Sequence, residues 1–135
     1  MNVEIEVEAY VNPTEDPSKV EAAIRNLFGN ITLEREPAGE GTVLRGRLMG
    51  IGSLENFKEM LRRDRVRDAA RAHLSSRVEG DTLRFGLTRQ AAYMKHISFY
   101  HPREAPLGPI QITIRGEASK VIDFLCGKGP AGEQH

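Results

Sequence analysis

Arginine is the residue type in this sequence that most directly suggests chemistry, because six arginines fall between positions 62 and 77. A guanidinium group is planar and can donate two charge-assisted hydrogen bonds at once to a phosphate, which a lysine cannot do. Arg63, Arg67 and Arg71 are four residues apart, a spacing that places them on one face of a helix. The segment is therefore a candidate for binding the phosphates of a nucleic acid.

The same segment also fits an ordinary solvated helix surface. Three acidic residues precede arginines by three or four positions, in the pairs Glu59 and Arg63, Asp64 and Arg67, and Asp68 and Arg71. Residues at this spacing form surface ion pairs that contribute little to stability. Spacing alone favours the solvated surface over nucleic-acid binding.

Metal binding and nucleophilic catalysis have weaker support. The histidines, at positions 73, 96, 101 and 135, lack the paired spacing on one helix that zinc hydrolases use. Cys126 is the one cysteine, which excludes an internal disulfide and a zinc site built from several cysteines of one chain. Its place on an apolar stripe predicts a small buried side chain. We therefore expect no metal, no cofactor and no catalytic residue.

An enzyme acting on a phosphorylated small molecule is a lower-ranked alternative. Gly50-Ile-Gly-Ser53 precedes a helix, so its backbone amides can hold a phosphate, with His96 or His101 as acid and base. The segment lacks the further glycine and the lysine of nucleotide-binding loops. A turn followed by a helix cap at Ser53 explains these residues adequately.

The overall composition describes one soluble domain of 135 residues, with 39% apolar and 28% charged residues. Nineteen basic and nineteen acidic residues cancel, so no global attraction to nucleic acid follows. The distribution is uneven: residues 1–40 carry three basic and nine acidic residues, a net charge of −6, whereas residues 41–100 carry twelve and six, a net charge of +6. Such opposite segments also favour a protein-interaction or scaffold domain that forms a homodimer or docks to a partner.

A cytoplasmic location is the expected one. No stretch approaches the roughly 20 apolar residues of a membrane span. Residues 1–10 lack the basic start and apolar run of a signal peptide. A lone cysteine suits a reducing compartment, so we expect no membrane partner.

Hydrophobic periodicity predicts the elements that position these residues. From Val3 to Val11, apolar residues alternate with polar ones, which is typical of a strand with one buried face. Asp16 and Pro17 are typical of a helix start, and this helix should run over 17–28. Further strands are expected at 31–36, 42–49, 82–87, 97–100 and 110–114, a helical region from Ser53 to Leu74 with a break near 63–65, and a helix at 117–126.

The predicted fold class is α+β, with two layers: a largely antiparallel sheet and helices packed on one of its faces. The element order over residues 2–87 is the split βαβ pattern, and two strands and a helix extend it. Residues 1–126 should form one domain, followed by a flexible tail at 127–135. In this topology the first and third strands are neighbours, so Arg45 and Arg47 can pair with glutamates of the first strand.

Four segments resemble an archaeal family known as uncharacterised protein family 0201. They are Val11-Asn-Pro-Thr-Glu-Asp-Pro17, the arginine-rich stretch Leu61–Arg71, Leu87-Thr-Arg-Gln-Ala-Ala-Tyr93 and Pro106-Leu-Gly-Pro-Ile110. The resemblance implies a compact fold similar to the ribosomal protein that holds 5S rRNA, a role in RNA binding and no enzyme activity. The matching positions include Arg65, Asp68, Arg71, Arg89 and Gln90. Asp64 and Arg67 occupy places where the family often has other residue types, which argues against a phosphate contact by Arg67.

These observations together predict a non-catalytic RNA-binding protein that recognises ribosomal or other structured RNA through a basic helix. Tyr10 is the one aromatic residue expected on the open face of the early strands, so backbone and shape recognition is expected more than base stacking. The candidate RNA-binding residues are Arg62, Arg63, Arg65, Arg71, Arg89, Gln90 and Lys95.

Overall fold

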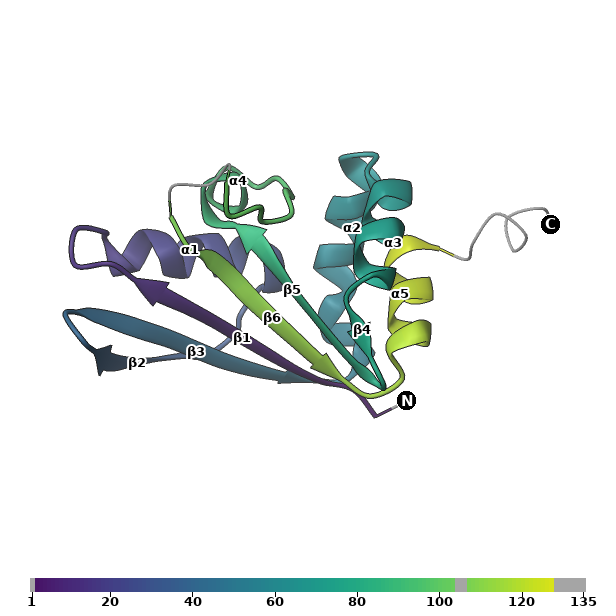
Figure 1. Ribbon diagram of the computed structural model, residues 1–135, viewed down its shortest axis with the longest axis horizontal. Coiled ribbons are helices and arrows are strands. Elements are labelled where there is room, and N and C mark those ends of the chain that lie inside the picture. The colour runs from purple at the N-terminus through teal and green to yellow at the C-terminus, as the bar shows by residue number, and fades with distance from the viewer. Residues whose placement is uncertain (1, 104–106, 128–135) are drawn as a thin grey trace.

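The computed structural model contains one antiparallel sheet with strand order β2-β3-β1-β6-β5-β4, and it describes residues 2–103 and 107–127 (Figure 1). The strands are β1 (Glu4–Val11), β2 (Leu33–Ala38), β3 (Gly41–Met49), β4 (Val78–Glu79), β5 (Thr82–Thr88) and β6 (Pro109–Arg115). The helices are α1 (Pro17–Phe28), the 3-10 turn η1 (Ile51–Leu54), α2 (Glu55–Arg63), α3 (Arg67–Ser75), α4 (Arg89–Tyr93) and α5 (Ala118–Cys126).

The sheet topology confirms the predicted fold class. Strand β3 lies between β1 and β2 and is antiparallel to both, so β1, α1 and β2 form the split βαβ unit. Strand β6, from the predicted extension, pairs with β1 on one side and with β5 on the other. The helices cover one face of the sheet and leave the other face open (Figure 1). None of the described helices is long and apolar enough to cross a membrane.

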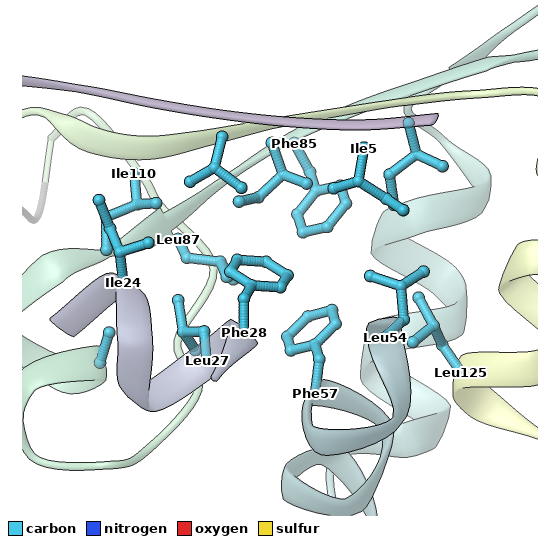
Figure 2. Packing of buried hydrophobic residues seen from close by; sticks show 14 of the residues in the cluster. Ile5, Ile24, Leu27, Phe28, Leu54, Phe57, Phe85, Leu87, Ile110 and Leu125 are labelled. Carbon is cyan, nitrogen blue, oxygen red and sulfur yellow. The ribbon is translucent and has the colours of Figure 1, made fainter. Parts of the chain in front are cut away.

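The core lies between the sheet and these helices. Alternation in β1 directs Ile5 and its apolar neighbours to the helices, and Ile5 is fully buried. Phe57 of α2 contacts Phe28 of α1 and Phe85 of β5, with ring centroids 5.9 and 6.0 Å away (Figure 2). Because these rings come from three elements, their burial fixes α1 and α2 against the sheet.

Helix α1 begins and ends as the sequence predicts. The Asp16 side chain accepts a hydrogen bond of 2.9 Å from the Ser18 N–H, and Pro17 occupies the first helical position. Gly29 ends the helix with a φ of 72°, a left-handed conformation that glycine adopts without steric cost. The ends of α2 and α4 differ, because a basic residue with a positive φ follows the cap of each.

Some predicted details are wrong, each for a local reason. Ser53 does not cap α2, because η1 intervenes and the Ser53 hydroxyl donates to the Gly50 carbonyl. Residues 97–100 form a single bridge, Phe99 to Leu87, beside β5 rather than a strand. The predicted break near 63–65 is confirmed and separates α2 from α3. Apart from Gly127, the predicted tail lies outside the described residues.

Candidate nucleic-acid interface

Exposed basic residues gather where the turn between α2 and α3 meets the turn after α4. The Arg63 side chain donates a hydrogen bond to the Lys95 carbonyl, and the Ile97 N–H donates to the Asp64 carboxylate at 3.1 Å. These two bonds hold together segments that are about thirty positions apart in the sequence. We call the resulting surface the basic corner, and it consists of Arg62, Arg63, Arg65, Arg67 and Lys95, all of them exposed.

Both turns of the basic corner end a helix in the same way. After α2, the Arg65 N–H bonds to the Arg62 carbonyl and the Val66 N–H to the Leu61 carbonyl. After α4, Lys95 N–H and His96 N–H make the equivalent bonds to the Ala92 and Ala91 carbonyls. This is the Schellman pattern, in which the residue following the cap is left-handed and is usually glycine.

Here that left-handed position is basic in both helices. Arg65 has a φ of 57° and Lys95 a φ of 64°, and the one other described non-glycine residue with a positive φ is Glu117. A side chain in this conformation costs about 1–2 kcal/mol, because Cβ approaches the backbone carbonyl oxygen. Each of the two turns therefore carries an exposed cation on a conformationally strained residue.

Asp64 is the acidic residue that organises the corner. Burial acts to raise the pKa of its carboxyl, but hydrogen bonds from the Ile97 N–H and from the Arg63 and His96 side chains outweigh this and lower the pKa. The carboxylate is therefore charged at neutral pH and bonded on several sides. Asp64 therefore links the two turns. Its oxygens bond to Arg63, His96 and Ile97, and not to Arg65 or Lys95.

The ion pairs that form differ from those expected from spacing. Arg62 pairs with Glu59 at 2.8 Å, and Arg63 pairs with Asp64 at 3.2 Å. Among residues 2–103 and 107–127, no ion pair within 4.0 Å involves Arg65, Arg67 or Lys95. Three of the five cations of the basic corner are thus available to an anionic partner, so the solvated-surface interpretation accounts for only part of the arrangement.

Arg67 and Arg71 are placed differently from what the sequence suggested. Arg67 begins α3 beside the strained turn, although its departure from the family pattern argued against a phosphate contact. A cation is electrostatically unfavourable at a helix N-terminus. Arginine at the first position of α3 is therefore a sequence signal that could have pointed to a binding role for Arg67. Arg71 is half-buried and bonds to Asp123 of α5 at 3.0 Å, so it joins two helices and lies outside the basic corner.

Arg89 corrects the predicted site most clearly, because it is buried. Its side chain is 4% exposed and pairs with Glu15 at 2.8 Å. The guanidinium also donates to three backbone carbonyls, those of Tyr10, Gly108 and Pro109, at 2.7–3.0 Å. A buried arginine whose nitrogens are all bonded cannot reach a phosphate, so Arg89 is a structural residue that fixes α4 against β1 and β6.

Glu15 completes this buried pair. Burial acts to raise the pKa of the Glu15 carboxyl, but hydrogen bonds from the backbone and side chain of Asn12, together with Arg89, lower it below its usual 4.5. The two Asn12 bonds measure 2.9 and 2.7 Å. The carboxylate therefore accepts bonds from two parts of the chain and stays ionised at neutral pH.

The open face of the sheet has a different character. The predicted pairing of the first and third strands is confirmed, since Arg45 lies 2.7 Å from Glu8, and Arg47 lies within 4 Å of Glu4 and Glu6. A hollow of about 690 Å³ on this face is lined by Glu6, Glu8, Glu34, Glu36, Arg45 and Arg47, among others. Four carboxylates against two guanidinium groups disfavour a phosphate backbone there.

The enzyme alternative gains no support from the position of His96. His96 contacts Asp64 just after the end of α2, whereas Gly50–Ser53 precede the start of that helix. Nine helical residues span about 13 Å, so the loop and the histidine do not converge. Cys126 is buried, and burial raises the pKa of its thiol to about 11, so the thiolate is scarce at neutral pH.

Gln90, the remaining candidate RNA-binding residue, is exposed and lines a groove between α1 and α4.

The fold and the corner define a class: a two-layer α+β protein with cations displayed on two joined turns. A family model described as RNA binding matches residues 4–116, from β1 to just beyond β6, and the chain belongs to this family. The predicted family resemblance is thereby confirmed. Its relatives carry the name UPF0201.

Individual relatives match over almost the whole chain. A UPF0201 protein of Sulfurisphaera tokodaii is 39% identical over 128 residues, which are 93% of this chain and 88% of that protein. One of Pyrococcus horikoshii is 36% identical over 130 residues, which are 96% and 93% of the two chains. The crystal structure of a UPF0201 protein from Methanococcus jannaschii has a TM-score of 0.82 at 30% identity and covers 96% of both chains.

Replacing Arg89 by methionine should lower the free energy of unfolding by about 3–5 kcal/mol, because Glu15 is left charged and partly buried without its partner. Replacement by lysine should also destabilise the protein, since an ammonium group cannot reproduce the planar donor fork. Urea unfolding at neutral pH measures both effects. Arg84→Met, at an exposed position of β5, is the control and should change stability by less than about 0.5 kcal/mol. Equal midpoints for Arg89→Met and Arg84→Met would contradict the structural role of Arg89.

The Glu15 carboxyl should also make stability depend on pH. Because its folded pKa is lower than its unfolded pKa, its stabilising contribution is present above pH 4.5 and is lost as the pH falls through the folded value. Wild type should therefore exceed Glu15→Gln in stability at pH 7, and the gap should narrow below pH 4.5. Urea midpoints across this range give the comparison, and a gap independent of pH would show that Glu15 carries no such linkage.

Proposed function

We propose that this protein is a non-catalytic RNA-binding protein that contacts the phosphates of structured RNA with the basic corner. The observation that carries the proposal is the pair of left-handed basic residues, Arg65 and Lys95, at two turns that are bonded to each other. Membership of a family described as RNA binding supports the same class of partner.

The strain at these residues is an argument for function. Among the described residues, glycine occupies six positions with a positive φ, including the end of α1. Arginine and lysine, one residue after the caps of α2 and α4, gain some favourable interaction with the helix dipole, typically about 0.3–1 kcal/mol. The steric cost is larger, about 1–2 kcal/mol for each residue. Strain that stability does not explain is characteristic of binding sites.

Two features favour RNA with a defined shape over an extended single strand. The cations sit on turns that are held by hydrogen bonds, so their positions relative to one another are fixed before binding. On the open sheet face, which single-strand readers use to stack bases, the hollow is lined by more carboxylates than guanidinium groups in this protein. We therefore expect contacts to the backbone of folded RNA, and ribosomal RNA is one such partner that the family resemblance implies. A cytoplasmic location fits this partner.

Self-association through opposite charges is the alternative proposal, and the structure supports it less than RNA binding. The acidic excess of residues 1–40 resides largely on β1 and β2, where Glu4, Glu6, Glu8 and Glu36 pair with arginines of the same chain. Charges that are already paired within one chain provide little further attraction between two copies. A homodimer would therefore need another surface.

Replacing the two left-handed residues by glycine should weaken RNA binding without lowering the stability of the protein. Arg65→Gly and Lys95→Gly should each leave the protein as stable as wild type or more stable, by up to about 1 kcal/mol, because relief of the strain exceeds the entropic cost of glycine. Each should weaken binding to a structured RNA several-fold, as one phosphate contact is lost. Thermal unfolding and filter binding measure the two effects.

Glu117→Gly is the matched control for these variants, because Glu117 is left-handed as well but acidic and outside the basic corner. It should change stability in the same direction and leave RNA affinity unaltered. If Arg65→Gly and Lys95→Gly also left the affinity unaltered, the basic corner would not be the binding surface.

The salt dependence of binding should report the same contacts. Each neutralised phosphate contributes about 0.7–0.9 to the slope of log affinity against log salt. The double variant Arg65→Gln/Arg67→Gln should therefore flatten this slope by about 1.5 and weaken binding to RNAs of different sequence alike. The control Arg45→Gln/Arg47→Gln changes two arginines of the open sheet face and should not flatten it. A common slope for the three proteins would rule out phosphate contacts by Arg65 and Arg67.

A further inference from the structure

A groove with a mostly apolar lining lies beside the basic corner, between α1 and α4. It has a volume of about 540 Å³, and Val20 and Ala23 of α1 and Leu107 contribute apolar surface to it. Glu15 and Arg89 also line it, but their charges neutralise each other in the buried pair. The groove is large enough for a small planar ring system, since pockets for small ligands are about 300–1,000 Å³.

Two large apolar side chains stand exposed at this groove. Tyr93 is 45% exposed and Met94 is 67% exposed, and both belong to its lining. Among the described residues, only Tyr10 and Met49 are exposed large hydrophobic side chains besides these two. Because the two side chains are adjacent and border the apolar lining of the groove, they extend one apolar patch, the kind of surface that marks contact sites.

The polar groups of the groove suit a nucleobase. Gln90 lines it, and its amide offers both a donor and an acceptor, the combination that pairs with a base edge. Lys19 of α1 and Asp16, which caps that helix, add one charge of each sign at the same groove. Tyrosine is one of the side chains on which unpaired bases stack in protein–RNA complexes.

The position of the groove in the chain links it to the phosphate contacts. Met94 is followed directly by Lys95 of the basic corner, and consecutive Cα atoms are about 3.8 Å apart. An RNA strand whose phosphate meets Lys95 therefore carries its bases within reach of Tyr93 and Met94.

Resting on the proposed function, we infer that this groove receives one unpaired base of the bound RNA, stacked on Tyr93 beside Met94 and hydrogen-bonded by Gln90. The RNA partner is accordingly a folded one that carries a bulged or looped-out nucleotide next to its paired stem. Charge complementarity favours this occupant over an apolar peptide, because the groove opens beside the cations of the basic corner.

Two RNA hairpins test this inference: a fully paired stem, and the same stem with one bulged 2-aminopurine. Wild type should bind the bulged hairpin about tenfold more tightly, since stacking of one base on an aromatic side chain is worth about that factor or more. The 2-aminopurine fluorescence should fall as the base stacks on Tyr93. Tyr93→Ala should lose the tenfold preference and keep the affinity for the paired stem, and Tyr93→Phe should retain the preference.

Matched controls exist within the chain. Tyr10→Ala and Met49→Ala remove side chains that are 40% and 68% exposed on other surfaces, and both variants should behave as wild type. Circular dichroism verifies that each variant is folded.

The outcomes separate this inference from the proposed function. Equal affinity of wild type for the two hairpins, unchanged by Tyr93→Ala, would overturn the base-binding groove and leave the basic corner standing. Binding to neither hairpin at low salt would overturn both. A concentration-dependent dimer that Tyr93→Ala dissociates would assign the groove to a second copy of the chain and also overturn the inference.

Discussion

The buried pair of Arg89 and Glu15 is the interaction on which the placement of the candidate site depends. A charge taken out of water is costly unless it is paired and fully hydrogen-bonded, and here one guanidinium meets a carboxylate and three carbonyl groups. Helix α4 has only five residues and cannot be stable alone. Arg89 begins this helix and fastens it to β1 and β6. Tyr93 and Lys95, four and six positions along, take their places from that attachment.

The same pair explains why separate segments of the sequence carry the family resemblance. Asn12 and Glu15 come from the first segment, Arg89 from the third, and Gly108 and Pro109 from the fourth. All three meet around one side chain in the structure. A resemblance that spans these segments therefore reports a shared architecture at this junction, and the residues of the basic corner lie next to it rather than in it.

Sequence patterns predicted the fold well because they report local physics. Alternation identified β1, the Asp16 and Pro17 signals identified α1, and the strand pairing placed Arg45 opposite the glutamates. The site was harder to predict, because an arginine in a sequence does not reveal whether it is exposed. Arg89 and Arg62 look alike until tertiary contacts bury one of them. The left-handed backbone of Arg65 and Lys95 was hidden for a related reason, since glycine is the usual signal for it. The groove joins residues from distant segments, so no local pattern marks it.

The central position of β6 has a consequence for how the chain acquires its structure. Glu4 pairs with Arg115, so the middle of the sheet joins the two ends of the described chain. During synthesis, β1, β2 and β3 can associate early, but the second edge of β1 stays unpaired until β6 has been made. Contacts of such long sequence separation slow folding, and an open strand edge can pair with other chains in the meantime. The last strand of the sheet thus closes the fold and also ends the period in which the nascent protein is most prone to aggregate.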